Sequence, residues 1–102
     1  MSMGNLAKMA QQMQADMARA QTEIEALVVE TSSGGGAVKA VVNGKQEVVS
    51  VTIDPSAVDP DDVEMLQDLI TAAVNDGLRQ VRDVAAEKMA RVTGGLRIPG
   101  LG

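Results

Sequence analysis

Apolar residues recur every three or four positions along two long stretches of this chain, and this repeat limits its possible folds more than any other feature. Such spacing predicts helices with one apolar face. In residues 5–27 the repeat consists of Leu6, Met9, Met13, Met17, Ala20, Ile24 and Leu27. In residues 60–92 it consists of Val63, Leu66, Ile70, Val74, Leu78, Val81, Ala85, Met89 and Val92. At about 1.5 Å per residue these helices would be about 35 and 50 Å long.

The ends of both helices carry recognisable capping signals. Asn5 is the expected N-cap of the first helix. The second is expected to begin with Asp59 at the N-cap and Pro60 at the first helical position, followed by acidic residues that favour the positive end of the helix dipole. The pair at 94–95 is Gly-Gly, which predicts the end of the second helix. A short tail, residues 96–102, remains.

The segment between the two helices is typical of β-structure. It is rich in Val and Thr and is interrupted by Gly and Asn, which predicts strands at about 28–33, 36–43 and 46–53. Asn43-Gly44 predicts a type I′ hairpin turn, because both residues tolerate a positive φ. The glycines at 34–36 would join the first two strands. We therefore expect a three-stranded antiparallel meander and an α+β fold overall.

Such long helices do not fit within a compact domain of this size. A compact domain of 100 residues has a radius of gyration of about 13 Å. The chain also contains no Phe, Tyr or Trp, so it lacks the side chains that contribute most to burial in a thick interior. The helices should therefore project beyond the sheet, with apolar stripes left for a second copy to cover. This predicts a closed, two-fold homodimer.

The composition argues against catalysis. With no His, Cys or Tyr, acid-base chemistry would fall to carboxylates or lysines, and no serine lies in a nucleophile pattern. The acidic run at 59–62 is better explained as a helix start than as a metal site. The glycines at 34–36 lack the Gly-Lys-Ser/Thr and following helix of a phosphate-binding loop. We expect neither an enzyme nor a bound cofactor or metal.

The hydropathy pattern also bears on where the protein works. No apolar run approaches the roughly 20 residues that a membrane span needs, and the first residues lack the continuous apolar core of a secretory signal. The absence of cysteine fits a reducing compartment. We expect a soluble protein of the cytoplasm with no membrane or small-molecule partner.

Charge is divided unevenly along the second predicted helix and its flanks. The whole chain has a formal net charge of −5. Residues 54–76 contain seven carboxylates and no base, whereas residues 79–97 contain two carboxylates and five bases, namely Arg79, Arg82, Lys88, Arg91 and Arg97. The helix dipole favours this order and explains part of it. A polyanionic partner is the other explanation.

The basic residues do not form one continuous stripe. At about 100° per residue, Arg79 and Arg82 lie on one flank of the apolar face, while Lys88 and Arg91 lie on the other. An anion-binding surface must then be assembled from more than one helix. The lack of aromatics disfavours recognition of single strands by stacking, whereas a duplex can be held through its phosphates alone. A helical scaffold for protein partners is the alternative, and the Met-rich stripe in 5–27 fits such a surface or a dimer seam.

Four segments in order resemble the YbaB/EbfC family of bacterial nucleoid-associated proteins. They are "MGNLAKMAQQMQADM", "VNGKQEVVSVTIDPS", "DVEMLQDLITAAVNDGLRQV" and "EKMARVTGGL". The resemblance implies an α-β-β-β-α protomer in residues 1–95 that forms a tweezer-like homodimer. It also implies binding of duplex DNA with little sequence preference and a change in the conformation of that DNA.

The family resemblance further implies which residues contact DNA. In the family, contacts are attributed to basic residues of the two helices, which in this sequence are Lys8, Arg19, Arg79, Arg82, Lys88 and Arg91. Roles in nucleoid organisation, gene regulation and DNA protection are attributed to such proteins. The expected location is therefore the nucleoid of a bacterial cytoplasm.

Overall fold

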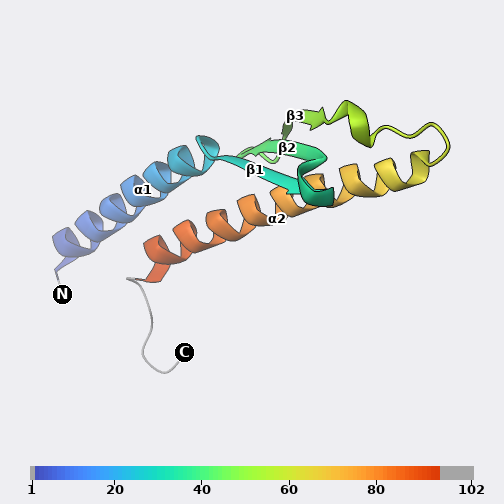
Figure 1. Cartoon of the computed structure of the whole chain (residues 1–102). Helices are drawn as coiled ribbons and strands as arrows, with labels where there is room; N and C mark the ends of the chain where they lie inside the picture. The colour runs from blue at the N-terminus through green and yellow to red at the C-terminus, as the bar shows by residue number, and fades with distance from the viewer. Residues whose placement is uncertain (1, 95–102) are drawn as a thin grey trace, which may run out of the picture.

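The fold is α+β, as the sequence predicts, in a computed structural model that describes residues 2–94. Figure 1 shows two helices and a small sheet. The elements in chain order are α1 (Met3–Glu25), β1 (Val28–Ser33), the short 3₁₀ helix η1 (Gly34–Gly36), β2 (Val38–Asn43), β3 (Val48–Ile53), a second 3₁₀ helix η2 (Pro55–Ala57) and α2 (Val63–Gly94). The predicted tail, residues 96–102, and Gly95 lie outside the described residues.

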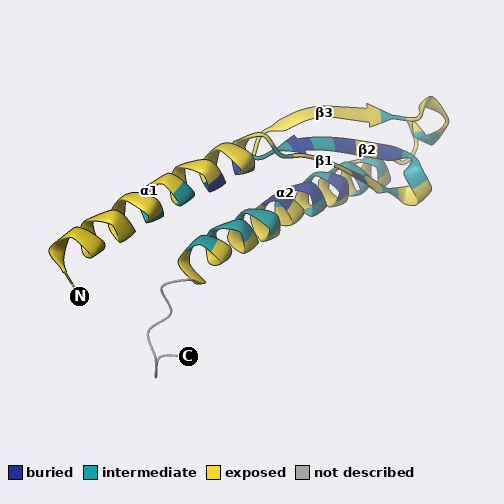
Figure 2. Cartoon of the chain, turned by 90° about the vertical axis from the view of Figure 1, so that its left-hand side faces the viewer, coloured by how far each residue is buried: buried dark blue, intermediate teal, exposed yellow. Residues whose placement is uncertain are grey.

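The chain is elongated because both helices continue beyond the sheet. The strands pair antiparallel in the order β1-β2-β3, and α2 lies across one face of this sheet. The C-terminal half of α2 runs on beside α1 (Figures 1 and 2). The radius of gyration is 20.1 Å, against about 13 Å for a compact domain of this length. The prediction of projecting helices is confirmed.

The core between α2 and the sheet is thin and built from small residues. Val38, Ala40 and Val42 alternate on β2 and are buried beneath α2, where Ala73 is also fully buried (Figure 2). Gly77 allows the closest approach, because a Cβ atom there would lie 2.7 Å from Cγ2 of Val42. Without aromatic side chains to fill a wider gap, the helix and the sheet must approach closely to exclude water.

Two hydroxyl groups of β1 fasten α2 to the sheet. Thr31 Oγ1 donates to the carbonyl of Ala73, and Ser33 Oγ donates to the carbonyl of Leu69, both at 2.6 Å. Thr31 is only 6% exposed, so its hydroxyl would cost free energy if it had no partner. Since Thr31 and Ser33 lie two residues apart on the strand and their acceptors lie one helical turn apart, the two bonds fix α2 along β1.

Helix α1 begins earlier than predicted and packs on α2 only in its second half. Ser2, rather than Asn5, is the N-cap, and its hydroxyl accepts a hydrogen bond from the Asn5 amide. Both residue types can cap, and Met3 and Gly4 extend the helix ahead of Asn5. Ala20 and Ile24 of the apolar stripe are buried, whereas other members stay exposed, namely Leu6, Met9 and Met17. Part of the stripe is therefore covered within one chain.

The turn between β2 and β3 differs from the predicted type I′ turn. Gln46, with φ of 61°, is the non-glycine residue with positive φ, and neither Asn43 nor Gly44 has one. The Asn43 side chain accepts hydrogen bonds from the amides of Lys45 and Glu47. The result is a three-residue loop with its last residue in the left-handed region, the next commonest hairpin connection.

Gly44 has a different role from the one predicted, which explains the altered turn. Its amide donates to the carbonyl of Leu27 at 2.9 Å. A Cβ atom at Gly44 would lie 1.5 Å from the carbonyl oxygen of Ile24. Glycine is thus required here by the close approach of the hairpin to the end of α1, and not by a positive φ.

Three further boundaries shift because of loop chemistry. The third strand begins at Val48 rather than 46, because residues 44–46 form the hairpin loop. The second strand begins at Val38 rather than 36, because Gly34, Gly35 and Gly36 all take positive φ and form η1. Helix α2 begins at Val63 rather than 60, and the Asp62 carboxylate, rather than that of Asp59, accepts from a first-turn amide, that of Met65. Asp59 instead closes a turn before the helix, where its carboxylate accepts from the Asp61 amide and its carbonyl accepts from the Asp62 amide.

The exposed carboxylate of Asp54 closes the turn that follows β3. The amide and hydroxyl of Ser56 donate to this carboxylate at 3.0 and 2.9 Å. These hydrogen bonds, from the amide first and the hydroxyl second, hold the pKa of Asp54 below its ordinary value.

Replacing Gly44 by alanine should destabilise the fold strongly. The new methyl group would overlap the Ile24 carbonyl, so the hairpin and the end of α1 would have to separate. We expect the free energy of unfolding to fall by about 2–3 kcal/mol, at the upper end for an overpacked site. Urea denaturation followed by circular dichroism at fixed protein concentration measures this.

Gly4→Ala is the matched control, because the nearest atom to a Cβ there is Ser2 Oγ at 3.9 Å. This substitution in the first turn of α1 should leave stability unchanged or raise it by up to about 1 kcal/mol. Equal stability of Gly44→Ala and the parent protein would contradict the described packing.

Candidate nucleic-acid interface

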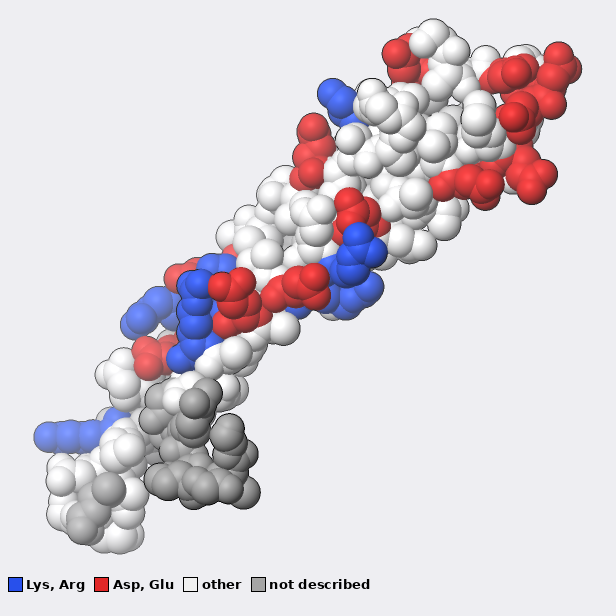
Figure 3. Space-filling view, turned by 60° about the horizontal axis from the view of Figure 1, so that its bottom comes forward, with Lys and Arg blue, Asp and Glu red and all other residues white. Residues whose placement is uncertain are grey.

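The two halves of the elongated molecule differ in charge. The end formed by η2, the loop after it and the start of α2 carries acidic side chains without basic ones, as Figure 3 shows at its upper right. Toward the other end, where α1 and α2 run together, Lys and Arg side chains gather among interspersed acids. We call this second region, residues 3–25 and 79–94, the helical arm. An approaching polyanion would be repelled by the first end, whereas the arm, with six basic and five acidic side chains, has a formal charge of +1 and offers it cationic groups.

All six basic residues predicted to contact DNA lie on the helical arm. Lys8 and Arg19 are on α1, and the other four, Arg79, Arg82, Lys88 and Arg91, are on α2. Five are exposed, while Lys88 is half-buried with its side chain 26% exposed.

A groove between the helices brings some of these residues together. It has a volume of about 390 Å³ and is lined by Asp16, Arg19, Ala20, Glu23, Arg91 and Val92. Beside it, Lys88 Nζ lies 3.4 Å from Glu23 Oε2 of α1. Arg19, Lys88 and Arg91 thus form one group from two helices, as the absence of a continuous basic stripe on one helix predicts.

The other predicted contacts lie apart from this groove. Lys8 precedes Arg19 by eleven residues, which is about 16 Å along the helix. Arg82 precedes Arg91 by nine residues, about 14 Å. Within residues 2–94 neither Lys8 nor Arg82 forms an ion pair. The basic residues are therefore spread along the arm, which suits repeated phosphates better than a single bound anion.

Carboxylates hold four of the six basic side chains, a feature that the sequence analysis missed. Three of the pairs each join two residues of the same helix. On α2 they are Arg79 with Asp76 and Arg91 with Glu87 at 2.6 Å, and on α1 Arg19 with Asp16 at 3.6 Å. The fourth joins Lys88 to Glu23 across the helices. The spacing of three or four residues could have indicated the first three. Nothing local in the sequence indicates the fourth.

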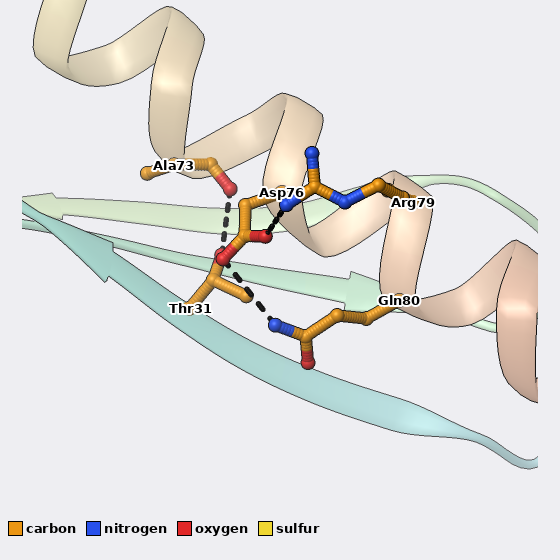
Figure 4. Close-up of polar contacts among 5 residues, drawn as sticks. All are labelled: Thr31, Ala73, Asp76, Arg79 and Gln80. Atoms are coloured by element: carbon orange, nitrogen blue, oxygen red, sulfur yellow. Dashed lines mark hydrogen bonds and ion pairs between the residues drawn. The ribbon is translucent and has the colours of Figure 1, made fainter.

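Asp76 is the most enclosed of these carboxylates. Its side chain is 33% exposed, and it contacts Arg79 through Oδ1. Gln80 Nε2 donates to its other oxygen, Oδ2, at 3.3 Å (Figure 4). Gln80, whose amide is of the kind that can pair with a base edge, is thus engaged with Asp76.

The described part of the chain contains neither a membrane-spanning helix nor a cluster of metal-binding side chains. Neither α1 nor α2 combines enough length with enough apolar character to span a membrane. Among residues 2–94, no three His, Cys, Asp or Glu side chains are placed to hold a metal ion. In the acidic run at 59–62, the carboxylates of Asp59 and Asp62 instead accept hydrogen bonds from backbone amides.

Comparisons with known proteins identify the family to which the chain is similar. The description of the YbaB/EbfC DNA-binding family matches residues 1–96. A nucleoid-associated protein of Pelotomaculum thermopropionicum is 54% identical over 96% of each chain. Another, from Desulforamulus reducens, is 57% identical over 98% of this chain and 95% of its own.

A solved structure is similar as well. The crystal structure of the uncharacterized protein HP0035 from Helicobacter pylori matches with a TM-score of 0.69 and 26% identity, and the match covers 85% of this chain and 91% of that one. The fold, the family match over nearly the whole chain and the level of identity agree. This chain belongs to the YbaB/EbfC DNA-binding family, a family of non-enzymatic proteins.

Proposed function

We propose that this chain is a nucleoid-associated protein that binds duplex DNA through its phosphates, with little sequence preference, and alters the conformation of that DNA. The observation that carries the proposal is the division of charge along the elongated molecule, with the basic side chains on the helical arm (Figure 3). Family membership and the names of the similar proteins support it. Roles in nucleoid organisation, gene regulation and DNA protection belong to the same proposal.

The chemistry of the arm suits phosphate binding. Arg19, Arg79 and Arg91 have side chains that are 67%, 64% and 72% exposed, so a phosphate oxygen can reach their guanidinium groups. Each phosphate that the protein neutralises contributes about −0.9 to the slope of log affinity against log salt. Sequence readout needs side chains that pair with base edges, and Gln80 is engaged by Asp76. Binding should therefore be salt-sensitive and nearly uniform across sequences.

We include a homodimer in this proposal, and place its main contact at β3 rather than along the helical apolar stripes that the sequence suggests. The strand lies at the outer edge of the sheet, where an unpaired edge is available to another chain. Three valines on or beside this edge are exposed, namely Val48 at 45%, Val49 at 58% and Val51 at 39%. Two chains joined here would present two helical arms, and a duplex that contacts both arms would have to adapt to their spacing.

The net charge of −5 is the observation that favours a protein-binding scaffold without DNA binding. Charge reversal on the arm distinguishes the two functions. Arg79→Glu combined with Arg82→Glu should abolish the binding of a random 30-base-pair duplex, because two phosphate contacts become repulsive. Gel shifts at increasing salt measure this, with sedimentation to show that the assembly is unchanged.

The matched control reverses two exposed lysines of the sheet and hairpin, Lys39→Glu with Lys45→Glu. Net charge changes equally in both variants, but the control leaves the helical arm intact and should bind much better than the arm variant. If the two variants bind alike, the surface is wrongly placed. If the parent protein shifts no duplex even at low salt, the scaffold function replaces the DNA-binding one.

Sedimentation equilibrium tests the dimer directly. We expect twice the chain mass of 10.6 kDa at micromolar concentration. Val49→Asp should shift the equilibrium toward single chains, because it places a charge within an apolar contact. Ser32→Asp, on the opposite edge strand, should leave the dimer intact. A parent protein that sediments as a single chain contradicts the dimer, and a Val49→Asp dimer of undiminished strength contradicts the β3 contact.

A further inference from the structure

The helical arm presents most of its positive charge already paired with carboxylates of the same chain. Arg79, Arg91 and Arg19 each contact an acid three or four residues earlier. A carboxylate and a phosphate use the same N–H donors of a guanidinium group. A phosphate that binds one of these arginines must therefore displace the carboxylate or share the guanidinium with it.

Asp76 is the carboxylate best placed to compete in this way. Its side chain is 33% exposed, against 62% for Glu87, and although Asp16 is about as enclosed at 35%, Asp16 lies 3.6 Å from Arg19. Gln80 also holds the second oxygen of Asp76 (Figure 4). A carboxylate fixed on both oxygens loses little conformational freedom when it holds Arg79, so it competes more effectively than one on a mobile, exposed side chain.

We propose that Asp76 sets the strength of DNA binding by competing with phosphate for the Arg79 guanidinium. This inference rests on the proposed DNA-binding function. Asp76 itself repels phosphate, so it acts on DNA only through Arg79. Glu87 and Asp16 act in the same direction on Arg91 and Arg19, with smaller effects. These three carboxylates thus keep the phosphate contacts of the three arginines weak, and stable binding requires several contacts at once.

The experiment measures the affinity of a fluorescent 30-base-pair duplex by anisotropy at fixed salt. Asp76→Asn keeps the shape of the side chain but removes its charge, so Arg79 becomes available to phosphate. Ion pairs in which one partner is this exposed, as Arg79 is at 64%, are worth little, and we expect affinity to increase about two- to fivefold. Circular dichroism checks that the variant is folded.

Asp83→Asn is the matched control. Asp83 lies on the same helix, its removal changes the net charge equally, and it forms no ion pair with another side chain of residues 2–94. It should therefore show only the general effect of one fewer negative charge, and Asp76→Asn should exceed it. A double-mutant cycle then isolates the specific effect. In an Arg79→Met background the additional gain from Asp76→Asn should disappear.

The outcomes separate this inference from the function on which it rests. A parent protein that binds DNA, with Asp76→Asn no tighter than Asp83→Asn, overturns the inference alone. A gain of the same size in the Arg79→Met background also overturns it, because Asp76 would then act by general repulsion. If neither the parent protein nor Asp76→Asn binds the duplex at low salt, the DNA-binding proposal fails and this inference fails with it.

Discussion

The packing of α2 onto β1 and β2 is the interaction on which the rest of the structure depends. It is close because small residues, Ala40, Ala73 and Gly77, meet between the helix and the sheet, and the chain has no aromatic side chain to fill a wider gap. The hydroxyls of Thr31 and Ser33 then fix the helix along the strand. A contact this thin holds only part of a 32-residue helix, so the remainder extends past the sheet and packs against α1.

This extension separates the charges of the protein in space. The acidic residues of 54–68 lie before α2 or near its start, whereas Arg79, Arg82, Lys88 and Arg91 lie further along the helix, toward its C-terminal end. The dipole of α2 favours the same order. An acidic protein can thereby present a basic surface, and the carboxylates beside Arg79 and Arg91 moderate that surface without removing it. The elongated shape and the proposed binding mode thus have a common origin.

The elements of the fold could be predicted from local sequence, and their tertiary contacts could not. The Val- and Thr-rich run at 28–33 has the bounds of β1 in the structure, and the long repeat at 63–92 lies within α2. The turn at Asn43-Gly44 was predicted wrongly, because Gly44 is required by the Ile24 carbonyl from another element. Asp59 and Asp62 are equally good caps locally, so the sequence did not distinguish them.

The same limit applies to the candidate site. The basic residues and their place on two helices follow from sequence and family resemblance. Their ion pairs within a helix are predictable from the spacing of three or four residues. The pair between Lys88 and Glu23 depends on how α1 lies against α2, and the groove that joins Arg19 to Arg91 depends on the same packing.

Hydrogen exchange with and without a duplex tests most directly whether DNA binds along the helical arm. Exchange reports on backbone amides, whereas the arm is defined by the charges of its side chains. We predict slower exchange on DNA binding in residues 79–91 and in the part of α1 beside them, with little change in the acidic residues 54–68. Protection confined to the sheet or to residues 54–68 would contradict the account.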